Sequence, residues 1–167
     1  SYPGNAWTSQ YTQPSDAAPY ERLGVAFAVM LTNPGVPLIY YGDEVGLAGG
    51  GDPDNRRMMP WSDTALNAHQ IALRTRVGAL ARARAQNLAL ARGSRTTLSS
   101  SQDTWVYRRG GCGMGAADVI VAINRADSAR MVDIPMGAYE DLLRMNAVTA
   151  GGRVEIPARG FLVWRAR

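Results

Sequence analysis

The chain has 167 residues and a formal net charge of +4, with 46% hydrophobic and 19% charged residues. This balance is typical of a globular protein and excludes a disordered or fibrous one. The length allows one ordinary domain, or part of a larger domain followed by a small complete one. No apolar run reaches the roughly 18 residues that a membrane-spanning helix needs, and nothing at the start of the chain indicates a signal peptide or a compartment.

The positive charge does not indicate a nucleic-acid partner. All 18 basic residues are arginine, a pattern typical of a GC-rich coding bias. The densest group, Arg74, Arg76, Arg82 and Arg84, alternates with apolar residues as on the solvent face of an amphipathic helix. A basic patch without a recognition motif is weak evidence for nucleic-acid binding. Cys112 is the single cysteine, so no internal disulfide forms, and no metal ligand or cofactor is assigned.

The first half of the chain predicts the order helix, buried strand, loop, helix. In residues 16–33 apolar side chains recur at helical spacing, and Pro34 ends the pattern. Residues 36–41, the apolar segment, have the composition of a parallel strand that is buried on both faces. The glycine-rich and charged residues 42–67, the candidate loop, are long enough to indicate a functional loop. Residues 68–85 predict a second amphipathic helix.

After Gly93 the pattern changes to short runs with β-propensity, separated by turn residues. Such spacing predicts an antiparallel β-sandwich. We place a domain boundary near residues 88–93. The predicted strands cover residues 95–98, 104–109, 119–124, 131–134, 142–146, 153–156 and 161–165.

Four segments of the chain resemble segments of a known protein family. Residues 35–46 read GVPLIYYGDEVG and resemble the eighth barrel strand and following turn of the α-amylase family, glycoside hydrolase family 13. Residues 49–61, GGGDPDNRRMMPW, are similar to the neopullulanase, cyclomaltodextrinase and maltogenic amylase group. Residues 88–93 and 156–161 resemble the start and the last strand of that family's C-terminal domain.

The resemblance implies a fold class of α/β plus all-β. Residues 1–88 are expected to be the C-terminal part of a catalytic (β/α)8 TIM barrel, and residues 89–167 a C-terminal antiparallel β-sandwich domain. It also implies a retaining glycoside hydrolase or transglycosylase that acts on α-1,4 and α-1,6 glucosidic bonds. The family's three catalytic carboxylates come from earlier barrel strands. We therefore expect no catalytic residue here, and a fragment that is inactive alone.

Two loop residues are candidates for substrate binding. Asp52 and Arg56 match the pair that contacts sugar units in the neopullulanase group. Asp accepts and Arg donates several hydrogen bonds in fixed geometry, as sugar hydroxyls require. The alternative is structural, with Arg56 or Arg57 paired to Asp52 or Asp54 to fix the loop, and both roles are compatible.

We do not expect catalysis or sugar stacking from the other polar and aromatic residues of this region. Asp43 and Glu44 leave the predicted strand on opposite sides, so we expect one of them to bind backbone N–H groups rather than to act in catalysis. Tyr40, Tyr41 and Trp61 are expected to line the core or a pocket wall rather than to stack on a sugar.

Three hypotheses remain at this point. In the first, the chain is part of an enzyme that binds an α-glucan or maltooligosaccharide, and it packs on the missing N-terminal part of the barrel or self-associates. In the second, it is a stand-alone β-sandwich carbohydrate-binding or scaffolding module. In the third and weakest, it is a basic nucleic-acid-binding domain with its arginines on one face. The predicted parallel strand without a parallel neighbour favours the first.

Overall fold

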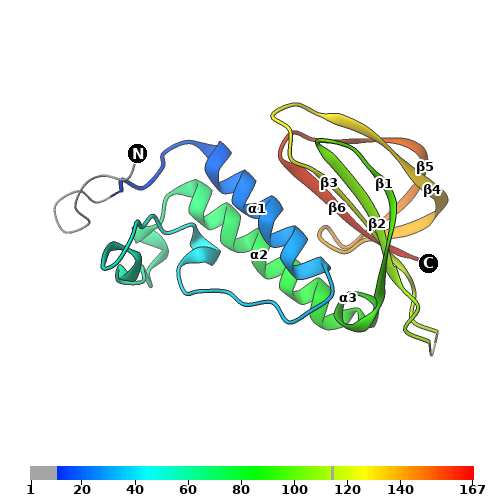
Figure 1. The fold of residues 1–167 in the computed structure, drawn as a ribbon, viewed down its shortest axis with the longest axis horizontal. Coiled ribbons are helices and arrows are strands. Elements are labelled where there is room, and N and C mark those ends of the chain that lie inside the picture. The colour runs from blue at the N-terminus through cyan, green and yellow to red at the C-terminus, as the bar shows by residue number, and fades with distance from the viewer. Residues whose placement is uncertain (1–10, 114) are drawn as a thin grey trace.

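Helices precede strands along the chain, and Figure 1 shows the helices side by side against one face of a sheet. The computed structural model describes residues 11–113 and 115–167. The elements are α1 (Ala17–Thr32), the short 3-10 turns η1 (Asp43–Val45), η2 (Asp54–Arg56) and η3 (Asp63–Ala65), α2 (Ala68–Gln86), α3 (Leu88–Arg92), β1 (Ser94–Ser100), β2 (Thr104–Gly110), β3 (Val119–Asn124), β4 (Arg130–Asp141), β5 (Asn146–Ile156) and β6 (Gly160–Ala166).

Both predicted helices are confirmed within one residue at each end. α1 ends before Asn33. Pro34 follows and cannot continue the helix, because its backbone nitrogen has no hydrogen to donate. α2 begins with a capping box, in which the Asn67 side chain accepts from the Gln70 N–H at 2.9 Å. The Gln70 side chain in return accepts from the Asn67 N–H at 3.1 Å. This reciprocal pair fixes the start of α2, where the candidate loop ends.

The helices and the sheet share one hydrophobic core. Leu80 of α2 and Leu90 of α3 are fully buried in it. On the sheet side, alternate residues of β3 point toward the helices, because successive side chains of a strand point to opposite faces. The core includes Phe27, Leu31, Leu73, Leu80, Leu90, Tyr107, Val119, Val121, Ile123 and Val163.

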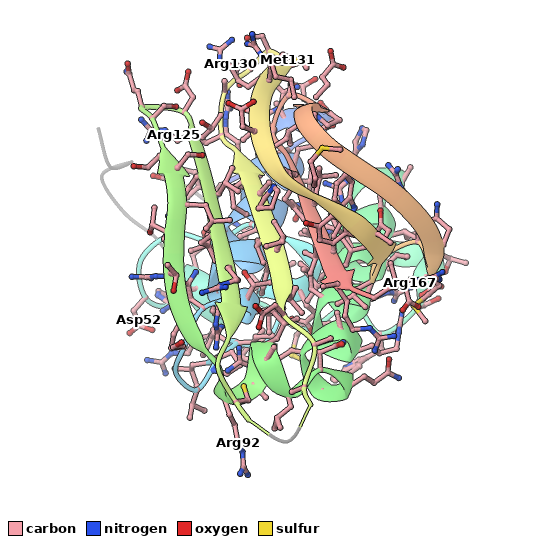
Figure 2. The ribbon with its side chains drawn as sticks, turned by 90° about the vertical axis from the view of Figure 1, so that its right-hand side faces the viewer. Asp52, Arg92, Arg125, Arg130, Met131 and Arg167 are labelled. Carbon is pink, nitrogen blue, oxygen red and sulfur yellow. The ribbon has the colours of Figure 1, made fainter. Side chains whose placement is uncertain are left out.

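The six strands are all antiparallel and follow the order β1-β2-β3-β6-β4-β5. β4 pairs with β6 only between Tyr139 and Asp141, whereas it pairs with β5 along most of its length. Figure 2 looks onto the sheet and shows β4 and β5 curling away from the other strands. The curl covers a second core of Val106, Ile120, Ala122, Val132, Ile134, Tyr139, Ile156 and Trp164.

The predicted sandwich is therefore corrected to one curled sheet that encloses a core between its own strands. Six of the seven predicted strands are confirmed, and β4 and β5 are longer than predicted. The run of residues 142–146 is mostly a turn, not a strand. The Asp141 carboxylate accepts from the N–H groups of Leu143 at 2.9 Å and Arg144 at 3.2 Å, so it replaces the ladder bonds that a strand would make.

The apolar segment is not a buried strand in this structure. Val36 is 95% exposed and Leu38 is 86% exposed. A strand needs a neighbour to satisfy its backbone groups, and none of the strands between residues 11 and 167 that the structure describes pairs with this segment. Figure 1 shows it as an extended connection after α1.

A ladder of ion pairs joins the first half of α1 to two turns of the sheet. Arg159 donates to Glu21 at 2.7 Å and to Asp127 at 2.9 Å. Arg22 also donates to Asp127, at 2.7 and 2.9 Å. The Arg159 and Arg22 guanidinium groups hold the pKa of Asp127 below its ordinary value.

We expect Asp127→Asn to lower the Tm slightly at pH 7, because an exposed carboxylate in an ion pair contributes little stability. The folded pKa is below the unfolded one, so this contribution is present above about pH 4 and is lost as pH falls through the folded pKa. Thermal unfolding of both proteins at pH 7 and pH 2 measures it. The difference in Tm should vanish at pH 2, and a difference of the same size at both pH values would contradict the assignment.

Candidate functional site

The candidate loop starts with a tight turn anchored to α2. η1 lies between Gly42, with φ of 92°, and Gly46, with φ of 58°, and this left-handed conformation favours glycine at both positions. Val45 is fully buried, and its carbonyl accepts from the Gln70 side chain at 3.1 Å. The side chain of Glu44 accepts from the Gly42 N–H at 2.9 Å. The expectation that one of the two adjacent carboxylates binds backbone N–H is thus confirmed for Glu44.

Asp43 is the other carboxylate of this turn. Desolvation raises the pKa of its carboxyl above the ordinary value, and the negative charge of Glu44 acts in the same direction. Asp43 lies in the wall of a pocket of about 290 Å³ between the end of the apolar segment and the middle of the candidate loop. The pocket is lined by Tyr40, Tyr41, Gly42, Asp43, Leu47, Ala48, Gly49, Asn55 and Arg57.

Asp54 is the buried centre of the loop, with 4% of its surface exposed. Its carboxylate accepts from Arg57 Nε at 2.7 Å and Nη2 at 2.8 Å, a bidentate pair. It also accepts from the Gly50 N–H at 2.9 Å. The hydrogen bond from Arg57 holds the pKa of Asp54 below its ordinary value. Asp54 and Arg57 therefore fix the loop, a role that the sequence offered only as one of several pairings.

A second support comes from a residue that the sequence analysis missed. Gln13 donates to the Gly46 carbonyl at 2.7 Å and to the Tyr20 hydroxyl at 2.7 Å, and its carbonyl accepts from the Ala48 N–H at 3.0 Å. Local sequence pattern gives no sign of these contacts, because Gln13 lies 33 positions before Gly46 and 35 positions before Ala48.

The structure brings Asp52 and Arg56 together at the surface. Arg56 Nη2 lies 2.8 Å from Asp52 Oδ1, and the two side chains are 66% and 64% exposed. Figure 2 shows Asp52 at the margin of the molecule. Exposed ion pairs of this kind contribute at most about 1 kcal/mol, so this pair does not hold the loop. Both side chains remain accessible to a ligand.

The aromatic residues near the loop differ in exposure. Tyr40 and Tyr41 contact each other with ring centroids 4.7 Å apart, and both line the pocket, as expected of wall residues. Trp61, in contrast, is 84% exposed. The expectation that it lies in a core or pocket wall is therefore wrong for this structure.

Neither metal binding nor membrane insertion finds support in the described residues. In the part of the chain outside residues 1–10 and 114, no group of three or more His, Cys, Asp or Glu side chains is arranged to hold a metal ion. Over the same residues, every helix is too short or too polar to cross a bilayer.

Comparison with known proteins finds relatives of this chain. The chain is 40% identical over 124 residues to a cyclomaltodextrin glucanotransferase from Paenibacillus macerans; the match covers 71% of this chain and 16% of that protein. The chain thus spans much less than a third of the length of this relative. No family model matches the chain. The narrower likeness to the neopullulanase group stays a prediction.

Two solved structures share the fold. An α-amylase from Geobacillus thermoleovorans, complexed with acarbose, matches with a TM-score of 0.74 and 25% identity, over 89% of this chain and 34% of that one. A cyclic α-maltosyl-(1→6)-maltose hydrolase from Arthrobacter globiformis matches with a TM-score of 0.69 and 28% identity, over 89% of this chain and 30% of that one. The chain belongs to the α-amylase family, glycoside hydrolase family 13, and corresponds to part of such a protein.

Proposed function

We propose that the chain is part of a retaining α-glucan-acting enzyme, in which residues 1–88 complete a (β/α)8 barrel and residues 89–167 form the C-terminal domain. The observation that carries the proposal is the exposed apolar segment. Strands of a parallel barrel are buried on both faces and consist largely of apolar residues. The segment has this composition but is open to solvent here, with Val36 and Leu38 almost fully exposed.

The position of the candidate loop supports a substrate-binding role. In (β/α)8 barrels the loops that follow the strands form the active-site face. The candidate loop follows the apolar segment directly, and the pair of buried Asp54 and partly buried Arg57 holds it in shape. In the longer protein this loop would overhang the sugar-binding cleft.

Asp52 and Arg56 are the proposed sugar contacts. A carboxylate and a guanidinium offer an acceptor and several donors to sugar hydroxyls. Their present ion pair is exposed and therefore weak, so sugar hydroxyls can replace it at little cost. The acarbose complex of the Geobacillus thermoleovorans α-amylase is consistent with a maltooligosaccharide as the ligand.

The chain alone is expected to be inactive. Retaining hydrolysis needs two carboxyl groups roughly 5 Å apart across the scissile bond. Glu44 accepts from a backbone N–H and Asp54 is paired with Arg57. Asp43 lies in the pocket wall, but the described lining of the pocket contains no second carboxylate to work with it. The nucleophile and the acid/base would come from the other part of the barrel.

The test is an assay of the longer protein on cyclodextrin, pullulan and starch, beside the isolated chain. We expect reducing-sugar release or glucosyl transfer from the longer protein only, and self-association of the isolated chain through its exposed apolar segment. An isolated chain that is monomeric and active would contradict the proposal. Binding of glucans by a monomeric, inactive chain would favour the stand-alone carbohydrate-binding module instead.

For the site itself, we expect Asp52→Ala in the longer protein to raise KM for long maltooligosaccharides about fivefold with little change in kcat, because one hydrogen bond to the substrate is lost. Short substrates that do not reach the loop should be unaffected. Asp63→Ala is the matched control, since Asp63 is an equally exposed carboxylate of the same loop paired with Arg74. Equal kinetics of Asp52→Ala and the control at all chain lengths would remove Asp52 from the site.

A further inference from the structure

The C-terminal end of α1 is held by guanidinium groups. The last carbonyls of a helix have no partner within the helix, and they form the negative end of its dipole. Arg84 Nη1 donates to the carbonyls of Leu31 at 2.8 Å and Asn33 at 3.0 Å. Arg109 Nη1 donates to the carbonyl between them, that of Thr32. Three successive carbonyls thus receive charge-assisted hydrogen bonds.

Arg84 extends the same contact to the residue that precedes the apolar segment. From α2 it also donates to the Gly35 carbonyl at 2.5 Å and to the Leu90 carbonyl of α3 at 3.0 Å. One side chain therefore joins the end of α1, the turn after it and α3. Because Gly35 is followed by Val36, Arg84 fixes the point at which the apolar segment starts.

The sheet contributes the other side of this arrangement. Arg109 of β2 is fully buried and also donates to the Gly93 carbonyl at 2.7 Å. The Tyr107 hydroxyl shares a hydrogen bond with the Thr32 hydroxyl and accepts from the Asn33 side chain at 3.3 Å. Burial raises the pKa of Tyr107 to about 12, so the phenol stays neutral at physiological pH.

A buried guanidinium adds little net stability, because the charge loses its hydration on burial. In the described part of the chain Arg109 donates to two carbonyls and pairs with no carboxylate, and burial lowers its pKa. Apolar residues of similar volume at such a site are often as stabilising as a buried charge. The gain from Arg109 is then geometric, because its planar group binds the Thr32 and Gly93 carbonyls in fixed directions.

We propose that Arg84 and Arg109 are positioning residues for the carbonyl end of α1. Arg84 of α2 ties it to the following turn and to α3, and Arg109 of β2 ties it to the sheet, so that together they set where the apolar segment begins and how it leads to the candidate loop. Through Arg109 the C-terminal sheet acts on the apolar segment, and so on the loop that carries Asp52 and Arg56. The effect on glucan kinetics rests on the proposed function, whereas the effect on the end of α1 does not.

The first test measures amide hydrogen exchange in the isolated chain. The Asn33 N–H donates to the Val29 carbonyl at 3.1 Å and reports on the end of α1. Arg84→Gln removes charged hydrogen bonds to this end, and we expect exchange at Asn33 to accelerate at least about tenfold. Arg82→Gln, an exposed arginine on the same helix, is the matched control and should leave exchange unchanged. Equal exchange in the two variants would overturn the proposal.

The second test uses the longer protein. Arg84→Gln should raise KM for maltooligosaccharides about tenfold while kcat stays within about twofold, because the loop is displaced and the chemical groups are not. A lowered Tm with unchanged KM would overturn the positioning role and leave a structural one. Arg109→Lys, which keeps the charge but not the two-directional geometry, should give the same KM effect in a milder form.

The two tests separate the two proposals. If the longer protein does not act on glucans but Arg84→Gln still frees Asn33 in the isolated chain, the proposed function fails and the lock on α1 stands. If the longer protein is active and exchange at Asn33 does not change, the function stands and the lock fails.

Discussion

Leu80→Ala is expected to lower the free energy of unfolding by about 2–5 kcal/mol, the range for a buried leucine that leaves a cavity. Leu80 is fully buried on α2, in the core that also contains Leu31 of α1 and Val163 of β6. Urea unfolding followed by circular dichroism measures the change. Because helices and sheet share this core, we expect both to unfold in one transition at a lower urea concentration.

The control for this prediction is Leu88→Ala. Leu88 lies at the start of α3 and is 37% exposed, so its truncation removes less contact and leaves no closed cavity. It should cost well under half of the loss caused by Leu80→Ala. A sheet that keeps its stability in Leu80→Ala, while the helices melt, would contradict the shared core.

Leu38→Asp is expected to be nearly neutral in the isolated chain and strongly destabilising in the longer protein. In the isolated chain Leu38 is 86% exposed, so at concentrations low enough to keep the chain monomeric a charge there should change the free energy of unfolding by less than about 0.5 kcal/mol. In the longer protein the same position would lie in a barrel strand, where an unpaired buried charge costs several kcal/mol or prevents folding. Chemical unfolding of both proteins with and without the substitution measures the contrast.

Met136→Asp serves as the control for this contrast. Met136 lies on β4, in the proposed C-terminal domain rather than in the barrel, and is 80% exposed in the isolated chain. It should be nearly neutral in both settings. If Leu38→Asp were as mild as Met136→Asp in the longer protein, the apolar segment would not be a barrel strand.

The helices could be predicted from the sequence because their information is local. In α1, Phe27 and Leu31 recur at helical spacing, and Pro34 ends the pattern. The Asn67 and Gln70 pair is likewise a local start signal for α2. The strands were found for the same reason, since turn residues separate them.

The extent of β4 and β5 could not be predicted, because their sequence signals conflict. Pro135 and Gly137 interrupt the apolar pattern of β4, although the strand continues through a shift in register between Ile134 and Gly137. Leu142 and Leu143 gave the following turn the composition of a strand. The Asp141 side chain decides the turn by binding two backbone N–H groups, a contact that composition does not reveal.

The apolar segment shows the limit of local sequence information most clearly. Its composition indicates a strand, but a strand forms only when neighbours satisfy its backbone groups. The candidate site has the same limit. Asp52 and Arg56 were selected by resemblance, whereas the pairing of Asp54 with Arg57 and the support from Gln13 depend on the folded path of the loop.

The most direct test of the account is hydrogen exchange along residues 38–41 in the longer protein and in the isolated chain. We expect these amides to exchange slowly in the longer protein, where strands on both sides would bind them, and quickly in the isolated chain, where Leu38 is exposed. Fast exchange at these amides in a folded longer protein would contradict the assignment of the segment to the barrel, and with it the placement of the candidate loop over a sugar cleft.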